Sequence, residues 1–391
     1  MDVQKLKRWL KRRIAHSFKL YDSRDMLYEN INLDLTRSQK RILVCYLDFQ
    51  QMAVILKAGV HHTNYLEFVQ ILKALIELDF VIDVSYYDSL DLSLKTKEKC
   101  YDYILGMGNA FREGCLNSIT KRKILYITEN PYEVSYRKEQ ERLDYFYQRT
   151  HIKKKLERTG VYYKSEDLKI ADTIICVGDK KFFDFRTKDV YRVTPSGLRN
   201  YNYKNTFYTR DTKSFLLFSS SEFIHKGIDI TIEIFNRHSD WKLYICGGSK
   251  WEHQLNSYGY KLNPNITLCG LIDVNSNRFI ELAKKCTFTI LLSCSEASPT
   301  GVLTCMRHGL IPIVQKDLGM ELYDKYCFIL NDYHIEYCEK EILRFTGMDR
   351  GKLEEMSDEI YEYANKEFSL SAYTDRFRNT IKAIMEKNGE I

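Results

Sequence analysis

The sequence predicts an α/β fold made of two domains. Short apolar segments rich in β-branched residues, such as 41–47 and 287–293, alternate along the 391 residues with longer segments of helical periodicity. Strands joined through a helix run parallel, so this alternation predicts open, mostly parallel sheets. The length suits two domains of ordinary size, and the polar, aperiodic stretch 198–213 places the boundary between them.

The composition fits a protein with reduced cysteines and full hydrophobic cores. Apolar residues make up 44% of the chain, and its eleven cysteines include no Cys-x-x-Cys pair and no His/Cys cluster at metal spacing. No apolar run reaches the length of a membrane span, and the N-terminus lacks the apolar core of a signal peptide, so we expect a cytoplasmic location. Outside residues 1–21 the basic and acidic side chains balance, which argues against nucleic acid as a partner.

Residues 1–21 account for the net charge of +6 and predict a basic amphipathic helix, in which Val3, Leu6 and Leu10 recur at helical spacing. One interpretation is a peripheral anchor that lies on an anionic membrane surface. The other is a helix that packs on the protein's own body. The polar residues 22–40 are interpreted as a linker.

The first domain is expected to hold five strands. They are predicted at 41–47, 80–86, 101–105, 123–128 and 171–177. A helix over 65–78, with Asn64 as its cap, connects the first two strands. Loops at the C-terminal ends of parallel strands face the ligand crevice. His61, its neighbour His62 and Glu129 lie in such loops. Glu129 and one of the two histidines are candidates for contact with an acceptor, although solvated loop residues would show the same pattern.

The second domain repeats this pattern. Its strands are predicted at 214–219, 241–246, 266–269, 287–293 and 310–314. The stretch 228–237 is ambiguous, because Ile228, Ile230, Ile232 and Ile234 alternate as they would in a strand. Two parallel strands before and after it require a crossover helix between them, so we predict a helix over 228–237.

The segment 287–314 predicts a buried strand, a polar turn, a short helix and a further strand. Ser298 is expected to cap the helix. The helix N-terminus near Thr300 and Gly301 offers unpaired N–H groups and a partial positive charge, which suit an anion. Glu296 is the carboxylate in that turn, and it suits a sugar or ribose hydroxyl better than a phosphate. The plain alternative is an ordinary strand–helix corner in which Glu296 is solvated.

The stretch SEASPTGVLTCMRHGLIPIV resembles the donor-site signature of GT-B-fold glycosyltransferases. It is similar to the retaining group (glycosyl transferases group 1) that carries two glutamates with seven residues between them. Glu296 matches the first glutamate, and Thr304 stands in the place of the second. The resemblance implies two Rossmann-like domains that face a cleft, with Glu296 against the donor sugar and the hydroxyl of Thr304 in place of the carboxylate that holds the nucleotide ribose.

Three further motifs extend the resemblance through the second domain. HKGIDITIEIF resembles the family's Lys-Gly segment, which implies that Lys226 contacts the donor diphosphate; Ser221 stands where the family usually has an arginine. LYICGG and LCGLI resemble two glycine turns, which implies that Gly247 and Leu271 take part in donor binding, the latter against the nucleotide base. The implied donor-binding set is completed by Ser298, Thr300, Gly301 and Thr304.

The resemblance also implies a division of labour between the domains. Residues 41–200 would form the acceptor-side domain and residues 214–370 the domain that binds the nucleotide-sugar. Residues 371–388 would form a helix that packs back on the first domain.

We therefore expect a glycosyltransferase that moves a sugar from a nucleotide-sugar to an acceptor hydroxyl, with Lys226 and Glu296 as catalytic residues. The resemblance implies retention of configuration. Because the sequence contains no Asp-x-Asp, we expect no metal ion to hold the diphosphate, and we expect no other cofactor. The basic segment 1–21 suits a glycan or lipid-linked acceptor at the inner face of the plasma membrane, as in bacterial surface polysaccharide or lipopolysaccharide assembly. Two alternatives stay open: a non-catalytic partner that binds a sugar nucleotide or glycan in an assembly complex, and a GT-B sugar-nucleotide epimerase.

Overall fold

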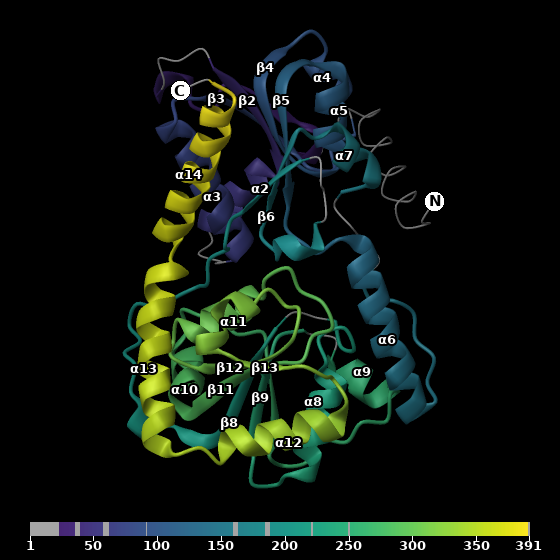
Figure 1. Ribbon diagram of the computed structural model, residues 1–391, viewed down its shortest axis with the longest axis vertical. Coiled ribbons are helices and arrows are strands. Elements are labelled where there is room, and N and C mark those ends of the chain that lie inside the picture. The colour runs from purple at the N-terminus through teal and green to yellow at the C-terminus, as the bar shows by residue number, and fades with distance from the viewer. Residues whose placement is uncertain are drawn as a thin grey trace.

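The computed structural model describes residues 23–35, 40–57, 62–90, 92–158, 163–183, 188–219, 222–248 and 251–389. Two α/β domains lie one above the other along the long axis (Figure 1). The sheet of the first has seven strands in the order β1-β3-β2-β4-β5-β6-β7, and that of the second has six in the order β10-β9-β8-β11-β12-β13. Among these strands, every pair is parallel except β1 with β3. The prediction of two mostly parallel sheets is confirmed.

The first domain contains all five of its predicted strands, each within a few residues. Its strands are β1 (Leu27–Tyr28), β2 (Arg41–Tyr46), β3 (Val81–Tyr86), β4 (Cys100–Gly106), β5 (Ile119–Ile127), β6 (Thr173–Cys176) and β7 (Asp189–Arg192). Its helices are α2 (Phe49–Lys57), α3 (Thr63–Glu77), α4 (Leu92–Thr96), α5 (Gly108–Asn117), α6 (Tyr132–Thr150) and α7 (Ser165–Ile170). The central strands are apolar on both faces because helices cover both sides of the sheet.

The start of α3 differs from the prediction. The helix begins at Thr63, and its cap is His62 rather than Asn64. The His62 Nδ1 accepts a hydrogen bond from the backbone N–H of Asn64, 3.3 Å away. The cap therefore lies two residues before the predicted one.

The linker predicted over 22–40 is also wrong for its described part. Residues 23–35 contain β1 and two short 3-10 turns. The side chain of Asn32 donates to the carbonyl of Phe80 at 2.7 Å and accepts from the N–H of Ile82 at 2.9 Å, which ties this segment to the edge of the sheet. Because a polar side chain makes these two hydrogen bonds, the hydrophobic pattern of the sequence does not predict the attachment.

The second domain follows the prediction closely. Its strands are β8 (Asp211–Phe218), β9 (Lys242–Cys246), β10 (Ile266–Gly270), β11 (Cys286–Leu291), β12 (Ile311–Gln315) and β13 (Phe328–Leu330). Its helices are α8 (Ile228–Arg237), α9 (Trp251–Ser257), α10 (Asn277–Lys285), α11 (Thr300–Met306), α12 (Ile335–Thr346) and α13 (Arg350–Glu367). The helix expected over 228–237 is confirmed at both ends.

The alternating isoleucines of α8 have a physical explanation. Ile228, Ile230, Ile232 and Ile234 are all fully buried. Besides the sheet, α12 packs against this helix, and Arg149 of α6 forms an ion pair with the carboxylate of its Asp229. A helix covered on several sides needs no polar stripe, so its sequence loses the helical period.

Two long helical elements tie the domains together on opposite sides (Figure 1). α6 runs from the first domain to the second, where Leu143 and Phe146 join the hydrophobic core. On the other side α13 leads into α14 (Leu370–Lys387), which packs on α3 of the first domain. There the hydroxyl oxygens of Tyr126 and Tyr373 lie 3.0 Å apart. The relative position of the two domains is thus fixed at both edges.

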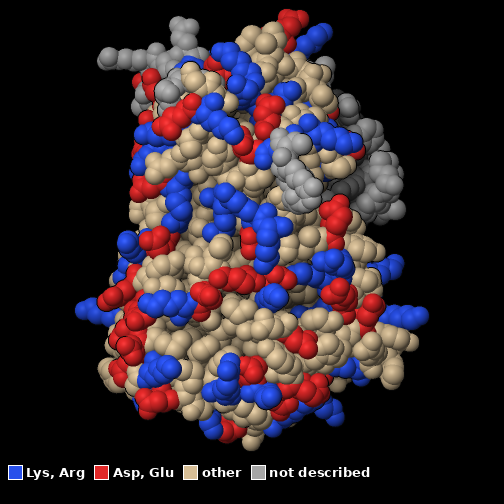
Figure 2. All heavy atoms as spheres, viewed as in Figure 1, with Lys and Arg blue, Asp and Glu red and all other residues tan. Residues whose placement is uncertain are grey.

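The surface carries both signs of charge. On the face shown in Figure 2, basic and acidic side chains are interspersed over both domains. Within the described ranges, no helix combines the length and the hydrophobicity needed to cross a membrane. The helix predicted over 1–21 lies outside the described residues.

Candidate active site

A cleft of about 910 Å³ lies between the C-terminal edges of the two sheets. Tyr46 and Val177, which end or follow strands of the first domain, face Phe218 and Leu291 at the strand ends of the second. Open parallel sheets bind their ligands at this edge. The predicted site residues that line the cleft are Glu129, Lys226, Leu271, Glu296, Ser298, Thr300, Gly301 and Thr304.

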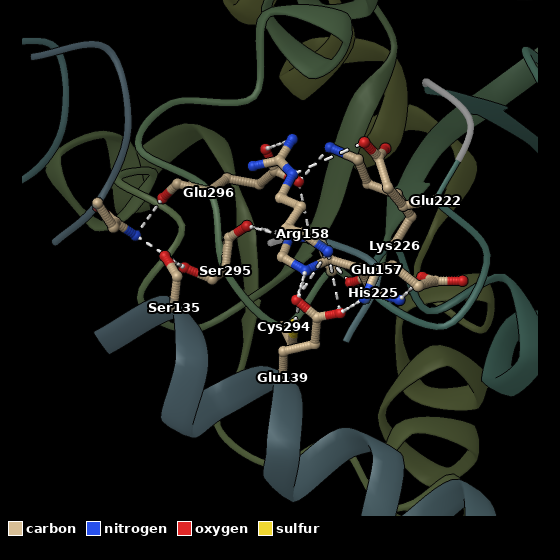
Figure 3. Close-up of polar contacts among 12 residues, drawn as sticks. Ser135, Glu139, Glu157, Arg158, Glu222, His225, Lys226, Cys294, Ser295 and Glu296 are labelled. Atoms are coloured by element: carbon tan, nitrogen blue, oxygen red, sulfur yellow. Dashed lines mark hydrogen bonds and ion pairs between the residues drawn. The ribbon is translucent and has the colours of Figure 1, made fainter. Parts of the chain in front are cut away.

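Lys226 and Glu296 form a buried ion pair in this cleft (Figure 3). The ammonium of Lys226 donates to Oε1 of Glu296, and the Ser293 hydroxyl donates to the same oxygen at 2.7 Å. Nη2 of Arg158 lies 3.7 Å from the other carboxylate oxygen. Burial by itself would raise the pKa of Glu296, but the charges of Lys226, Arg158 and His225 outweigh it and lower the pKa to about 2. Glu296 is therefore an ionised acceptor of hydrogen bonds at neutral pH.

The backbone at Gly227 brings Lys226 to this position. Gly227 has φ of +68°, and a Cβ placed on it would lie 2.2 Å from the carbonyl oxygen of Leu292. The turn therefore needs glycine both for its left-handed conformation and for its close approach to the chain after β11. The glycine that follows the lysine is what lets α8 begin against the segment that carries Glu296.

His225, the neighbour of Lys226, links α6 to the segment that carries Glu296 (Figure 3). Its Nδ1 lies 3.1 Å from Oε2 of Glu139 on α6, and its Nε2 lies 2.8 Å from the carbonyl oxygen of Ser295. Both partners are acceptors, so both ring nitrogens carry protons. Burial by itself would lower the pKa of His225, but Cys294 and Glu139 outweigh it and raise the pKa to about 9. The ring is therefore a buried imidazolium.

The segment after α6 brings a second cation to the cleft. Glu157 accepts from the backbone N–H of Phe223 at 3.2 Å and of His225 at 2.7 Å. Glu139 in turn accepts from the backbone N–H groups of Glu157 and Arg158. These contacts aim Arg158 at the cleft. No local pattern in the charged sequence of α6 predicts these contacts.

The start of α11 lies at the floor of the cleft. Pro299 occupies the cap position, and the hydroxyl of Ser298, predicted to cap the helix, is buried and has no hydrogen-bond partner among the described residues. That prediction is wrong, and the Ser298 hydroxyl is left available to a ligand. Gly301 packs against β8, where an added Cβ would lie 2.4 Å from the carbonyl oxygen of Phe218. The Thr300 hydroxyl lies 3.4 Å from that of Thr63 in the opposite domain.

Thr304 lines the cleft, but its hydroxyl already bonds within the protein. It donates to the carbonyl of Thr300 at 2.8 Å and accepts from the N–H of Leu198 at 3.0 Å. The side chain thus fixes the segment between the domains against α11. A contact from this hydroxyl to a ribose would compete with these two bonds.

The two residues implied by the glycine turns differ in position. Leu271 lines the cleft and is 77% exposed, as an open apolar platform would be. Gly247 lies outside the lining of the cleft. Its N–H donates to the carbonyl of Gly270 at 2.9 Å, and an added Cβ would clash with the carbonyl oxygen of Ser219. Gly247 allows β9 to turn beside β8.

On the acceptor side, Glu129 lines the cleft, and His61 lies outside the described residues, as does Ser221 in the second domain. His62, the other candidate histidine of that loop, lines the cleft. Burial lowers its pKa, so its ring is neutral at physiological pH. Deeper in the cleft, burial outweighs the hydrogen bonds from Ser196 and raises the pKa of Glu67 to about 7.

Residues 202–323 match the family described as "Glycosyl transferases group 1". The second domain is a glycosyl transferases group 1 domain. The matched range runs from the domain boundary past α11, and it includes both Lys226 and Glu296. No curated protein sequence gives a significant match to the chain.

Solved structures show which fold the whole chain shares. Sucrose-phosphate synthase from Thermosynechococcus elongatus is 10% identical with a TM-score of 0.61, over 89% of this chain and 100% of that one. HepE from Anabaena is 10% identical with a TM-score of 0.55, over 88% and 100%. WaaG, a glycosyltransferase involved in lipopolysaccharide biosynthesis, is 13% identical with a TM-score of 0.52, over 87% and 99%. These likenesses confirm the predicted GT-B fold.

The family match and the fold together confirm that the chain is a glycosyltransferase enzyme. In this glycosyltransferase the matched domain supplies one wall of the cleft, and the first domain supplies the other. The subgroup with two glutamates, and the part that Thr304 plays in place of the second, stay predictions.

Proposed function

We propose that this glycosyltransferase transfers a sugar from a nucleotide-sugar on the second domain to an acceptor hydroxyl on the first, with retention and without a metal ion. The observation that carries the proposal is the pair of Lys226 and Glu296 in the cleft. A fixed cation and a permanently ionised carboxylate lie side by side, where a diphosphate and its sugar would meet.

Each side chain has a defined part in this reaction. The ammonium of Lys226 leaves Glu296 for the donor diphosphate and offsets the negative charge that grows on it as the bond from sugar C1 to phosphate oxygen breaks. Glu296 accepts hydrogen bonds from the sugar hydroxyls and stabilises the positive charge of the oxocarbenium-like sugar. The acceptor oxygen bonds to C1 on the face that the phosphate leaves, and its proton passes to the leaving phosphate oxygen.

We propose the assembly of a bacterial surface polysaccharide or lipopolysaccharide as the setting, with a glycan or lipid-linked acceptor. The likeness to WaaG supports this setting. The likeness to HepE, which was solved with UDP and glucose, supports a nucleotide-sugar as the donor. The basic segment 1–21 would hold the enzyme on the inner face of the plasma membrane. If deletion of these residues left the distribution between membrane and soluble fractions unchanged, the membrane part of the proposal would be dropped.

The reaction is tested by incubating the protein with UDP-, GDP-, CMP- and dTDP-sugars and a panel of glycan acceptors, with and without EDTA. The proposal predicts release of one nucleotide that depends on an acceptor and is unaffected by EDTA, and a product whose anomeric configuration, read by NMR, matches the donor. Binding without turnover would favour the non-catalytic partner. Consumption of the donor without an acceptor, with an altered sugar, would favour the epimerase.

A further inference from the structure

Two cations lie in the cleft, and they come from different parts of the chain. Lys226 is the only lysine and Arg158 the only arginine among the described residues that line the cleft. Lys226 belongs to the second domain, whereas Arg158 follows α6, the helix that starts in the first. Both lie beside the same carboxylate, that of Glu296 (Figure 3).

The backbone at Arg158 is held firmly by α6 and by the segment that leads into α8. Its N–H donates to Oε1 of Glu139 at 3.3 Å, and the preceding residue, Glu157, accepts from the backbone of Phe223 and His225. Because His225 adjoins Lys226, one network of buried charges sets the positions of both cations. Arg158 is thus built into the site, unlike a side chain on a solvated loop.

The guanidinium of Arg158 lies near two carboxylates but is too far from both for a close hydrogen bond. Its Nη2 lies 3.7 Å from Oε2 of Glu296, and its Nε lies 3.8 Å from Oε1 of Glu222. Both distances exceed the roughly 2.7–2.9 Å of a charge-assisted hydrogen bond. The side chain is 32% exposed, toward the cleft that it lines. Its donors are therefore within reach of a ligand.

We infer that Arg158 binds the diphosphate of the nucleotide-sugar together with Lys226, so that the donor site is completed by the segment that follows α6. This inference rests on the proposed function. The planar guanidinium matches two phosphate oxygens at once, which the point charge of a lysine does not. When the diphosphate enters, Arg158 and Lys226 turn from Glu296 to the phosphate oxygens, and the carboxylate is released to the sugar.

The inference is tested by calorimetric titration of the full chain with UDP, GDP, CDP and dTDP and with the matching nucleosides. The variants are Arg158→Ala and Arg158→Lys, and the control is Lys155→Ala, an exposed cation in the same segment. Arg158→Ala should weaken binding of the preferred diphosphate about tenfold or more and leave the nucleoside within about twofold, because phosphate alone is contacted. Arg158→Lys should fall between, and the control should match the wild type.

The outcomes separate this inference from the proposed function. If the wild type binds a diphosphate and Arg158→Ala binds it equally well, Arg158 is no phosphate ligand and the proposed function stands. Equal losses for diphosphate and nucleoside would show a structural role and overturn the inference. If the wild type binds none of the four diphosphates, the proposed function fails and takes the inference with it. Thermal unfolding of Arg158→Lys guards against misreading a folding defect as lost binding.

Discussion

The carboxylate of Glu139 on α6 and the imidazolium of His225 form a buried ion pair, with 3.1 Å between Oε2 and Nδ1. The two side chains are 1% and 0% exposed. Loss of either partner would leave the other charge unpaired in a buried environment that solvates it poorly. The pair therefore couples the position of α6 to that of Lys226, the next residue along the chain.

The first prediction concerns the strength of this coupling. Glu139→Gln should lower the free energy of unfolding by about 3–5 kcal/mol, the usual effect of removing one partner of a buried ion pair. Urea unfolding at neutral pH measures it. Glu141→Gln on the exposed face of the same helix is the matched control and should change stability by less than about 0.5 kcal/mol. Equal stabilities for both variants would show that the pair does not stabilise the fold.

The second prediction concerns pH. His225 has its pKa raised to about 9 from an ordinary value of 6.5, so its protonated form is favoured in the folded protein. Its contribution to stability is fully present below pH 6.5 and is lost as the pH rises through 9, by about 3 kcal/mol in total. Unfolding free energies measured from pH 6 to 9.5 should fall in the wild type and in an exposed His253→Gln control. They should fall less steeply in His225→Gln, and equal slopes in all three would refute the assignment.

These two predictions rest on contacts that the sequence did not reveal. The strands and α8 were predictable, because β-branched runs and the need for a crossover helix leave few arrangements. Lys226 and Glu296 were found through the resemblance, since both lie in short motifs. Glu139 and Arg158 carry no local signal: Glu139 lies 86 positions from His225, and its charged neighbours are those of an ordinary solvated helix.

Two smaller errors have a similar origin. Ser298 precedes Pro299 in a sequence typical of a capped helix, yet the proline itself takes the cap position. Asn32 sits in a stretch without apolar alternation, and its amide still ties that stretch to β3. In both cases a local rule gives way to contacts that only the folded chain provides.

The third prediction concerns catalysis. Lys226→Ala should lower kcat about a hundredfold or more, because the charge that develops on the leaving diphosphate loses its fixed counter-charge. Initial rates of nucleotide release at saturating donor measure it. Lys213→Ala removes an exposed lysine that pairs with Asp240 at the far end of β8 and should keep the wild-type rate. If Lys226→Ala released nucleotide at the wild-type rate, Lys226 would not be a catalytic residue.

The fourth prediction concerns the return of α14 to the first domain. Tyr373→Phe removes one hydroxyl of the buried pair with Tyr126 and should destabilise the protein by about 1 kcal/mol, since the partner hydroxyl loses its hydrogen bond. Tyr208→Phe, at a side chain that is 76% exposed, is the control and should be neutral. Chemical unfolding of the two variants makes the comparison, and a loss of stability in Tyr208→Phe alone would contradict it.

The central claim is that the second domain binds the nucleotide and that Glu296 faces the sugar. Thermal stabilisation by UDP-, GDP-, CMP- and dTDP-sugars, with the free nucleotides beside them, tests it most directly in wild type and Glu296→Ala. We predict that one nucleotide raises the Tm of both proteins, and that its sugar form adds stabilisation in the wild type and loses that addition in the variant. If no nucleotide or sugar nucleotide shifted the Tm of the wild type, the donor site would be wrongly placed.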